Sequence, residues 1–259
     1  MNISILASGT RGDVQPYIGL GVGLKQGGHT IRILTSDDFE DLVAGAGLEF
    51  GSIGDSIEAI LQNDEWRAVT EKGNFLLIVS KMQAEMKKRA YQFAEKIPPL
   101  LTQTDMMIAG AGGMGFSIAE KLKIPLVQAF VYPFTPTSEF PSPLTPKLPF
   151  GDLLNRASFH IMRQMIWQSG RMGDTTVRRE LGLKRGSFFG HYRQENRLKL
   201  PVLYGYSRHV IPKPTDWDAH HHVTGYWFLD PSMDWQPPQD LVSFLEAGSP
   251  PVYIGFGSM

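Results

Sequence analysis

The first 35 residues alternate a short apolar run, a glycine-containing loop and a helical pattern, and this alternation limits the fold strongly. Residues 3–7 predict a buried strand, and residues 8–13 form the loop after it. A helix follows with Pro16 in its first turn, where the missing amide hydrogen is harmless, and glycines at 27–28 end it. Residues 30–35 predict a second strand. Such units wind right-handed into a parallel sheet, so the sequence predicts an α/β, Rossmann-like domain.

The same alternation continues along the chain until a proline-rich stretch interrupts it. Further strands are predicted at 105–109, 125–130, 202–204 and 222–224, and helices at 38–46, within 55–104, up to residue 122 and at 156–181. Residues 132–149 contain six prolines and predict a long irregular loop, which in a compact domain is often functional.

A change of composition near residue 230 divides the chain. Residues 1–230 are predicted to form one domain, and the proline-rich residues 231–250 an interdomain linker with a short helix at 241–247. Residues 251–259 predict the first strand of a further, truncated domain. The expected organisation is therefore one Rossmann-like domain, a linker and the start of a second domain.

Composition excludes several classes of protein. The formal net charge of −1 gives no reason to expect nucleic acid as a partner, and the absence of cysteine excludes disulfides and thiolate metal sites. The opening residues lack a basic segment of the kind that begins a signal peptide, and no apolar run reaches the roughly 18 residues of a membrane-spanning helix. A cytoplasmic protein, at most peripheral to a membrane, is expected.

The loop at residues 8–13 is the first candidate site, because ligands bind at the carboxyl ends of strands in open parallel sheets. Asp13 stands at the start of the helix, where a carboxylate can simply cap the helix and interact with its dipole. A capping role and a catalytic role are compatible, since a cap also fixes the side chain. Arg11 is expected to form an ion pair with Asp13, the alternative being a phosphate contact.

Four separate segments resemble the sterol glucosyltransferases and the bacterial transferases that glycosylate antibiotic aglycones. The first is the loop Gly-Thr-Arg-Gly-Asp-Val-Gln-Pro-Tyr at 9–17, and the second is the proline-rich segment at 134–141. The others are Val-Thr-Gly-Tyr-Trp-Phe-Leu-Asp at 223–230 and Pro-Pro-Val-Tyr-Ile-Gly-Phe-Gly-Ser-Met at 250–259. The resemblance thus spans the chain in order.

The resemblance implies one half of an enzyme with two Rossmann-like domains, the GT-B fold. The N-terminal half would bind the acceptor, and a C-terminal half would bind a UDP-sugar, with UDP-glucose expected as co-substrate and no metal or resident cofactor. Asp13 would be the general base that takes the proton from an acceptor hydroxyl, and the anomeric configuration would invert. The fragment alone is expected to be inactive.

The resemblance also implies two groups of binding residues. The expected acceptor wall comprises Gly112, Gly113, Phe116, Phe134, Thr135 and Phe140. The expected donor contacts are Ser8, Gly9, Thr10, Gly257 and Ser258. An apolar wall beside Asp13 would suit a lipophilic alcohol such as a sterol, although ordinary core packing explains the aromatic residues equally well. Many plant relatives use a histidine oriented by an aspartate; here Asp13 occupies the loop directly, so that dyad does not apply.

Two other motifs suggest different chemistry. Residues 110–115 fit G-x-G-x-x-G, but no acidic residue follows the next predicted strand to bind a ribose, so close packing or a flat acceptor wall is the preferred interpretation. The histidines at 220–222 alternate faces in a strand and have no acidic cluster beside them, so no metal site is predicted.

Residues 151–200 leave a question of surface chemistry open. They contain ten Lys or Arg against four Asp or Glu, interleaved with large apolar residues. A solvated helix face is one interpretation, and a surface that rests on anionic lipid is the other. Two alternatives to a two-domain enzyme also remain: a half-enzyme that recruits a separate donor subunit, and a non-catalytic module that binds apolar ligands.

Overall fold

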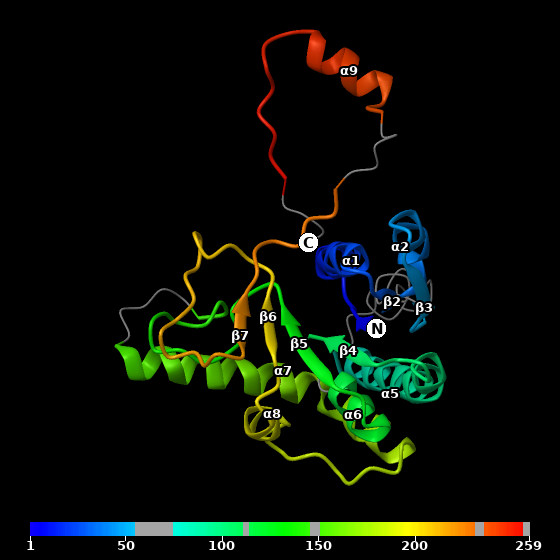
Figure 1. Ribbon diagram of the computed structural model, residues 1–259, viewed down its shortest axis with the longest axis vertical. Helices are drawn as coiled ribbons and strands as arrows, with labels where there is room; N and C mark the ends of the chain where they lie inside the picture. The colour runs from blue at the N-terminus through cyan, green and yellow to red at the C-terminus, as the bar shows by residue number, and fades with distance from the viewer. Residues whose placement is uncertain (55–74, 111–113, 146–150, 231–235, 256–259) are drawn as a thin grey trace.

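The computed structural model describes residues 1–54, 75–110, 114–145, 151–230 and 236–255. Its centre is a parallel sheet of seven strands in the order β3-β2-β1-β4-β5-β6-β7 (Figure 1). The strands are β1 (Asn2–Leu6), β2 (Thr30–Thr35), β3 (Glu49–Ser52), β4 (Met106–Ala109), β5 (Leu126–Phe130), β6 (Val202–Tyr204) and β7 (His221–Val223). The strand order reverses direction at β1, which places the end of β1 at the switch point of the sheet.

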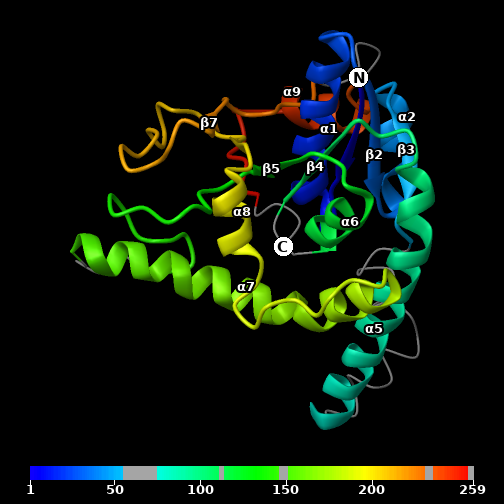
Figure 2. The same cartoon turned by 60° about the horizontal axis from the view of Figure 1, so that its bottom comes forward.

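Helices cover both faces of the sheet (Figure 2). They are α1 (Arg11–Gln26), the 3₁₀ turn η1 (Asp37–Phe39), α2 (Glu40–Gly45), α5 (Phe75–Leu100), α6 (Met114–Leu122), α7 (Asp152–Glu180), α8 (Tyr192–Leu198) and α9 (Gln239–Glu246). Two apolar clusters fix the layers: α1 and α2 pack on one face, and α5, α6 and the end of α7 pack on the other. Within the described ranges, no helix has the length and apolar content needed to cross a bilayer.

The α/β prediction is confirmed, and most element bounds agree within a few residues. Two elements were not predicted, β3 and α8. The strand β3 (Glu49–Ser52) has the sequence Glu-Phe-Gly-Ser, which lacks the continuous apolar run typical of a buried strand; pairing with β2 makes it a strand. Residues 251–255 have no strand pairing among the described residues, and the rest of the strand expected at 251–259 lies outside them, so that expectation stays a prediction.

Candidate functional site

The loop after β1 and the start of α1 place Asp13 at the carboxyl end of β1, next to the switch point of the sheet. Thr10 is the N-cap residue of α1. Its backbone N–H donates a hydrogen bond to Asp13 Oδ2 at 2.8 Å, and its hydroxyl oxygen lies 3.1 Å from the same carboxylate oxygen. The Asp13 amide in turn donates to the Thr10 carbonyl at 2.9 Å. Among the described residues none donates a hydrogen bond to Asp13 Oδ1. One oxygen therefore holds the side chain in place, and the other is available to a ligand.

Gly9 allows this arrangement because only glycine adopts its backbone conformation at no steric cost. Its φ is +133°, in the region that L side chains rarely adopt. A Cβ at this position would also lie 2.7 Å from Asp13 Cγ, so any side chain would displace the carboxylate. The loop sequence thus fixes the position of Asp13 through both backbone conformation and space.

A cavity of about 500 Å³ opens beside Asp13. This volume lies in the range of small-molecule sites, roughly 300–1,000 Å³. The loop after β1, the carboxyl ends of β4 and β5, and the helices α5 and α7 all contribute to it. Its larger apolar lining residues are Leu6, Ile53, Phe93, Phe130, Val131 and Ile166. The cavity is therefore apolar for the most part, with one carboxylate at its edge.

Two tyrosines line the cavity near the carboxylate. Burial raises the pKa of Tyr17, and the neighbouring Tyr132 and Asp13 raise it further to a smaller extent. Burial and the Asp13 charge likewise raise the pKa of Tyr132. Both phenols therefore stay protonated at neutral pH. The Tyr17 hydroxyl donates a hydrogen bond to the Ala129 carbonyl oxygen at 2.7 Å, and this contact fixes the ring against the sheet.

The glycines at 110 and 115 serve close packing. A Cβ on Gly110 would lie 2.9 Å from the Tyr17 hydroxyl oxygen, and a Cβ on Gly115 would lie 2.9 Å from Ala109 Cβ. Both glycines also line the cavity. These contacts agree with the packing interpretation of the G-x-G-x-x-G motif. Gly112 and Gly113, predicted for the acceptor wall, lie outside the described residues.

The aromatic residues predicted for the acceptor wall are not among the described residues that line the cavity. Phe134 is 1% exposed and stacks on Phe130, a lining residue, with ring centroids 4.5 Å apart. Phe140 packs edge-on against Phe159 at 6.1 Å, and Phe116 stacks on His191 at 4.8 Å. Phe116 and Phe134 are thus core residues, and Phe140 is partly buried against the same cluster as Phe134.

Thr135 also has a structural contact. Its backbone N–H donates to the Tyr204 hydroxyl at 2.9 Å, and that hydroxyl donates to Thr135 Oγ1 at 2.7 Å. The pair ties the proline-rich loop to β6. Thr135 and the three phenylalanines are not among the described residues that line the cavity.

The predicted donor contacts divide into three groups. Ser8 and Gly9 line the cavity, and Thr10 holds Asp13. Gly257 and Ser258 lie outside the described residues. The ion pair expected between Arg11 and Asp13 is wrong: Arg11 Nε donates to Gln15 Oε1 at 2.9 Å, one turn further along α1.

The contribution of α5 and α7 to the cavity was not predicted from the sequence. Arg89 lines it from α5, and Ser169, Gly170 and Gly173 line it from α7. The sequence does contain a sign of this wall: two glycines and a serine lie within five residues of the long helix α7, and their small side chains leave space beside the helix backbone. This space lets a ligand or another element approach the helix backbone closely.

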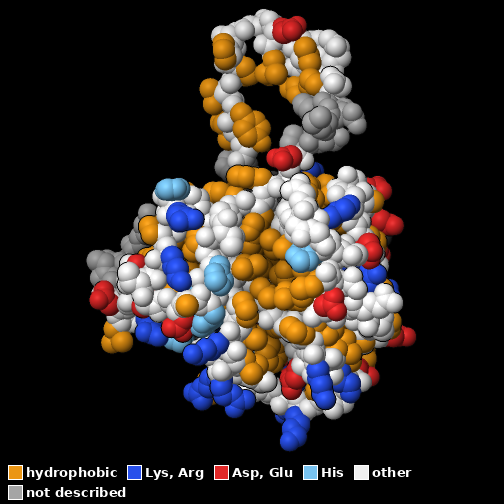
Figure 3. All heavy atoms as spheres, in the orientation of Figure 1, with side chains coloured by type: hydrophobic (Ala, Val, Ile, Leu, Met, Phe, Trp, Pro, Cys, Tyr) orange, Lys and Arg blue, Asp and Glu red, His pale blue; other side chains and the backbone are white. Residues whose placement is uncertain are grey.

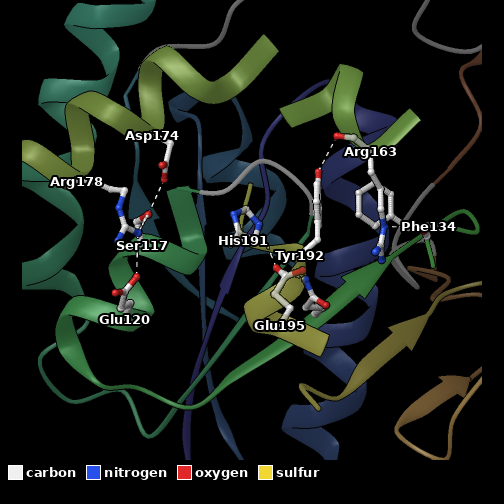
Figure 4. A network of polar contacts seen from close by, with 10 residues as sticks. Ser117, Glu120, Phe134, Arg163, Asp174, Arg178, His191, Tyr192 and Glu195 are labelled. Atoms are coloured by element: carbon white, nitrogen blue, oxygen red, sulfur yellow. Dashed lines mark hydrogen bonds and ion pairs between the residues drawn. The ribbon is translucent and has the colours of Figure 1, made fainter. Parts of the chain in front are cut away.

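A polar cluster ties α7 to α6 on one side of this wall (Figure 4). Ser117 donates to Asp174 Oδ1 at 2.5 Å, and Arg178 Nη1 lies 3.0 Å from Ser117 Oγ and 2.9 Å from Glu120 Oε2. Burial raises the pKa of Asp174, although the Ser117 hydrogen bond and the Arg178 charge oppose that shift. These contacts fix the end of α7 that carries the cavity glycines.

A second cluster joins α8 to the sheet (Figure 4). Glu195, 4% exposed, accepts from Gln128 Nε2 at 2.7 Å and lies 3.1 Å from His191 Nε2. The buried Arg163 of α7 donates a hydrogen bond to the Phe134 carbonyl oxygen at 3.1 Å, and its guanidinium interacts electrostatically with the Glu195 carboxylate. Burial lowers the pKa of Arg163 and outweighs the opposing Glu195 charge. The cluster stabilises the aromatic core behind the cavity.

The fold is a Rossmann-like domain with a mainly apolar cavity and a carboxylate at its switch point. A spinosyn forosaminyltransferase has the same fold, with a TM-score of 0.52 at 13% identity over 93% of this chain and 54% of that one. The model of the glycosyltransferase family 28 N-terminal domain matches residues 3–141. The chain belongs to that family.

Curated relatives match the chain from end to end. The sterol 3-beta-glucosyltransferase UGT80A2 of Arabidopsis thaliana is 35% identical over 271 aligned residues, which cover 100% of this chain and 41% of the relative. A sterol 3-beta-glucosyltransferase of Cryptococcus neoformans is 33% identical, with 100% of this chain and 17% of the relative covered. The chain thus spans less than half the length of these relatives.

Proposed function

We propose that the chain is the acceptor-binding half of an inverting glycosyltransferase that moves a hexose from a UDP-sugar to the hydroxyl of a lipophilic acceptor such as a sterol. The observation that carries this proposal is the exposed Asp13 carboxylate at the edge of a mainly apolar cavity of about 500 Å³. Two sterol 3-beta-glucosyltransferases at 33–35% identity support the acceptor class.

Asp13 would act as the general base in this reaction. The acceptor hydroxyl becomes acidic as its oxygen bonds to the anomeric carbon, so a carboxylate held in place can take the proton at that moment. Oδ2 is already bound to Thr10, which leaves Oδ1 for the hydroxyl. A single direct displacement needs no enzyme nucleophile and inverts the anomeric carbon.

The UDP-sugar, with UDP-glucose as the proposed donor, would bind mainly to a C-terminal domain opposite the cavity. The relatives are more than twice as long as this chain, which gives room for such a domain. Ser8 and Gly9 face the cavity from the β1 loop and would contact the donor from this side. In this arrangement the isolated chain binds acceptor and does not transfer sugar.

A bulky residue in the α7 wall should weaken acceptor binding. Ser169 lines the cavity, and tryptophan there would occupy acceptor volume. A misfit of one methylene group in an apolar pocket changes the preference for a ligand by roughly 10–200-fold. The larger misfit in Ser169→Trp should therefore raise the acceptor KM or Kd at least about tenfold. The matched control is Leu153→Trp on the same helix, because Leu153 is 82% exposed and lies outside the cavity. Equal acceptor affinities for the two variants would contradict this placement of the acceptor.

We further propose that α7 contacts the membrane from which a lipophilic acceptor is collected. Leu154, Ile161, Met165 and Met172 are each at least 49% exposed and follow one another at helical spacing. The exposed Arg179 lies two turns beyond Met172, in line with this stripe. Ile161→Glu together with Met165→Glu should reduce sedimentation with anionic vesicles severalfold; unchanged sedimentation would oppose the proposal.

A further inference from the structure

A second groove lies at the same edge of the sheet, between the end of β7 and the loop after β6. Four strand intervals separate β1 from β7, which at ~4.8 Å each places the groove about 19 Å from the Asp13 loop. Its lining residues are Arg208, His209, Pro212, Lys213, His221, His222, Val223 and Thr224. The groove is distinct from the acceptor cavity, because the two have no lining residue in common.

The charge of this groove has one sign. Arg208 and Lys213 supply two exposed cations, and none of the residues that line the groove carries a carboxylate. Figure 3 shows Lys, Arg and His side chains gathered over β7 and the loop before it. Lys213 Nζ donates to the Asp218 backbone carbonyl at 3.0 Å, which holds the loop against the turn that precedes β7. This contact fixes Lys213 beside the start of β7, and Arg208 lines the same groove.

His221 gives the groove a polar group from inside the protein. It is 8% exposed, and its Nδ1 is buried with no hydrogen-bond partner among the described residues. Its ring packs on Trp217, with centroids 5.5 Å apart, and on His220 at 4.3 Å, so the imidazole is fixed. Burial, more than the neighbouring His220, lowers the pKa of His221 to about 4, and a neutral imidazole still offers one N–H donor.

We propose that this groove binds a phosphate-class anion, a phosphate monoester or diphosphate, between Arg208, Lys213 and the buried His221. Guanidinium and ammonium groups form charge-assisted hydrogen bonds to phosphate oxygens, and these are stronger than neutral ones. The orphaned His221 nitrogen would gain a partner in the same step. The anion can come from a soluble phosphate compound or from the headgroup of a phospholipid.

The first test is calorimetric titration of the chain with inorganic phosphate and with pyrophosphate at pH 7 and low salt. We expect saturable binding that weakens at least tenfold in Arg208→Ala/Lys213→Ala, whose positions are both exposed. The matched control is Lys87→Ala/Lys121→Ala, which removes the same charge from exposed positions elsewhere and should bind like the parent. No saturable binding, or an equal loss in the control, overturns the proposal.

The second test follows the NMR signals of His221 and distinguishes a soluble phosphate compound from a phospholipid headgroup. The imidazole ¹⁵N signals of His221 should shift on addition of pyrophosphate, and His221→Phe, which keeps a ring against Trp217, should bind it severalfold more weakly. If vesicles that contain phosphorylated inositol lipid bind the parent and the lysine control but not Arg208→Ala/Lys213→Ala, the ligand is a lipid headgroup. If pyrophosphate binds and the vesicles do not, the ligand is a soluble phosphate compound. Unmoved His221 signals at saturating pyrophosphate contradict the site.

Discussion

Replacing Asp13 by asparagine in the full-length protein should lower kcat by about 10²–10⁴-fold, the usual contribution of a positioned general base. The reason is that asparagine cannot accept the proton that the acceptor hydroxyl loses. Its side-chain oxygen can still accept the Thr10 hydrogen bonds that Asp13 Oδ2 accepts at 2.8 and 3.1 Å. Initial rates at saturating donor and acceptor measure the effect.

The fold should survive this change. Losing one carboxylate at a helix N-terminus costs about 0.3–1 kcal/mol, a small part of the stability of a domain. Thermal unfolding and acceptor binding should therefore stay near the parent values. A near-normal kcat for Asp13→Asn would remove Asp13 from the chemistry and favour a module that only binds apolar ligands.

Replacing Glu195 by alanine should produce the largest loss of stability. The change leaves the buried Arg163 without the charge that opposes its desolvation, and it leaves Gln128 Nε2 and His191 Nε2 without their acceptor. Removing one partner from a buried ionic cluster costs about 3–5 kcal/mol. For a domain of this size, with about 2–4 °C per kcal/mol, the Tm should fall by roughly 6–20 °C.

Glu180→Ala is the matched control for that measurement. Glu180 is also a helical glutamate with an ionic partner, but its side chain is 39% exposed and its partner Arg179 is 59% exposed. Exposed pairs contribute about 0–1 kcal/mol, so its Tm should change little. Similar Tm values for the two variants would mean that the buried cluster contributes no more than an exposed pair.

The sequence predicted the sheet well because its inner strands are buried on both faces. β1 places Ile3 and Ile5 in the α1 layer and β5 is buried at all five positions, so each is a mainly apolar run with one polar residue, Ser4 or Gln128, inside it. The edge elements lack that signal. β3 becomes a strand through its pairing with β2, which a local pattern does not contain.

The site was predictable only where a local motif defines it. The loop at 8–13 joins a strand to a helix start, and this alone places Asp13 at the carboxyl edge of the sheet. The cavity wall depends on which side of α7 faces the sheet, and this follows from contacts between α7 and α5, α6 and α8. For that reason Phe134, predicted for the acceptor wall, lies in the core and Phe140 is partly buried against it, while Ser169 lines the cavity.

The most direct test of the central claim is the stereochemistry of transfer by the full-length protein. The protein is incubated with UDP-α-glucose and a sterol, and the anomeric proton of the product is read by NMR. We expect a β-glucoside, because Asp13 would deprotonate the hydroxyl for one direct displacement. An α-glucoside, or no transfer to any lipophilic alcohol, would contradict it.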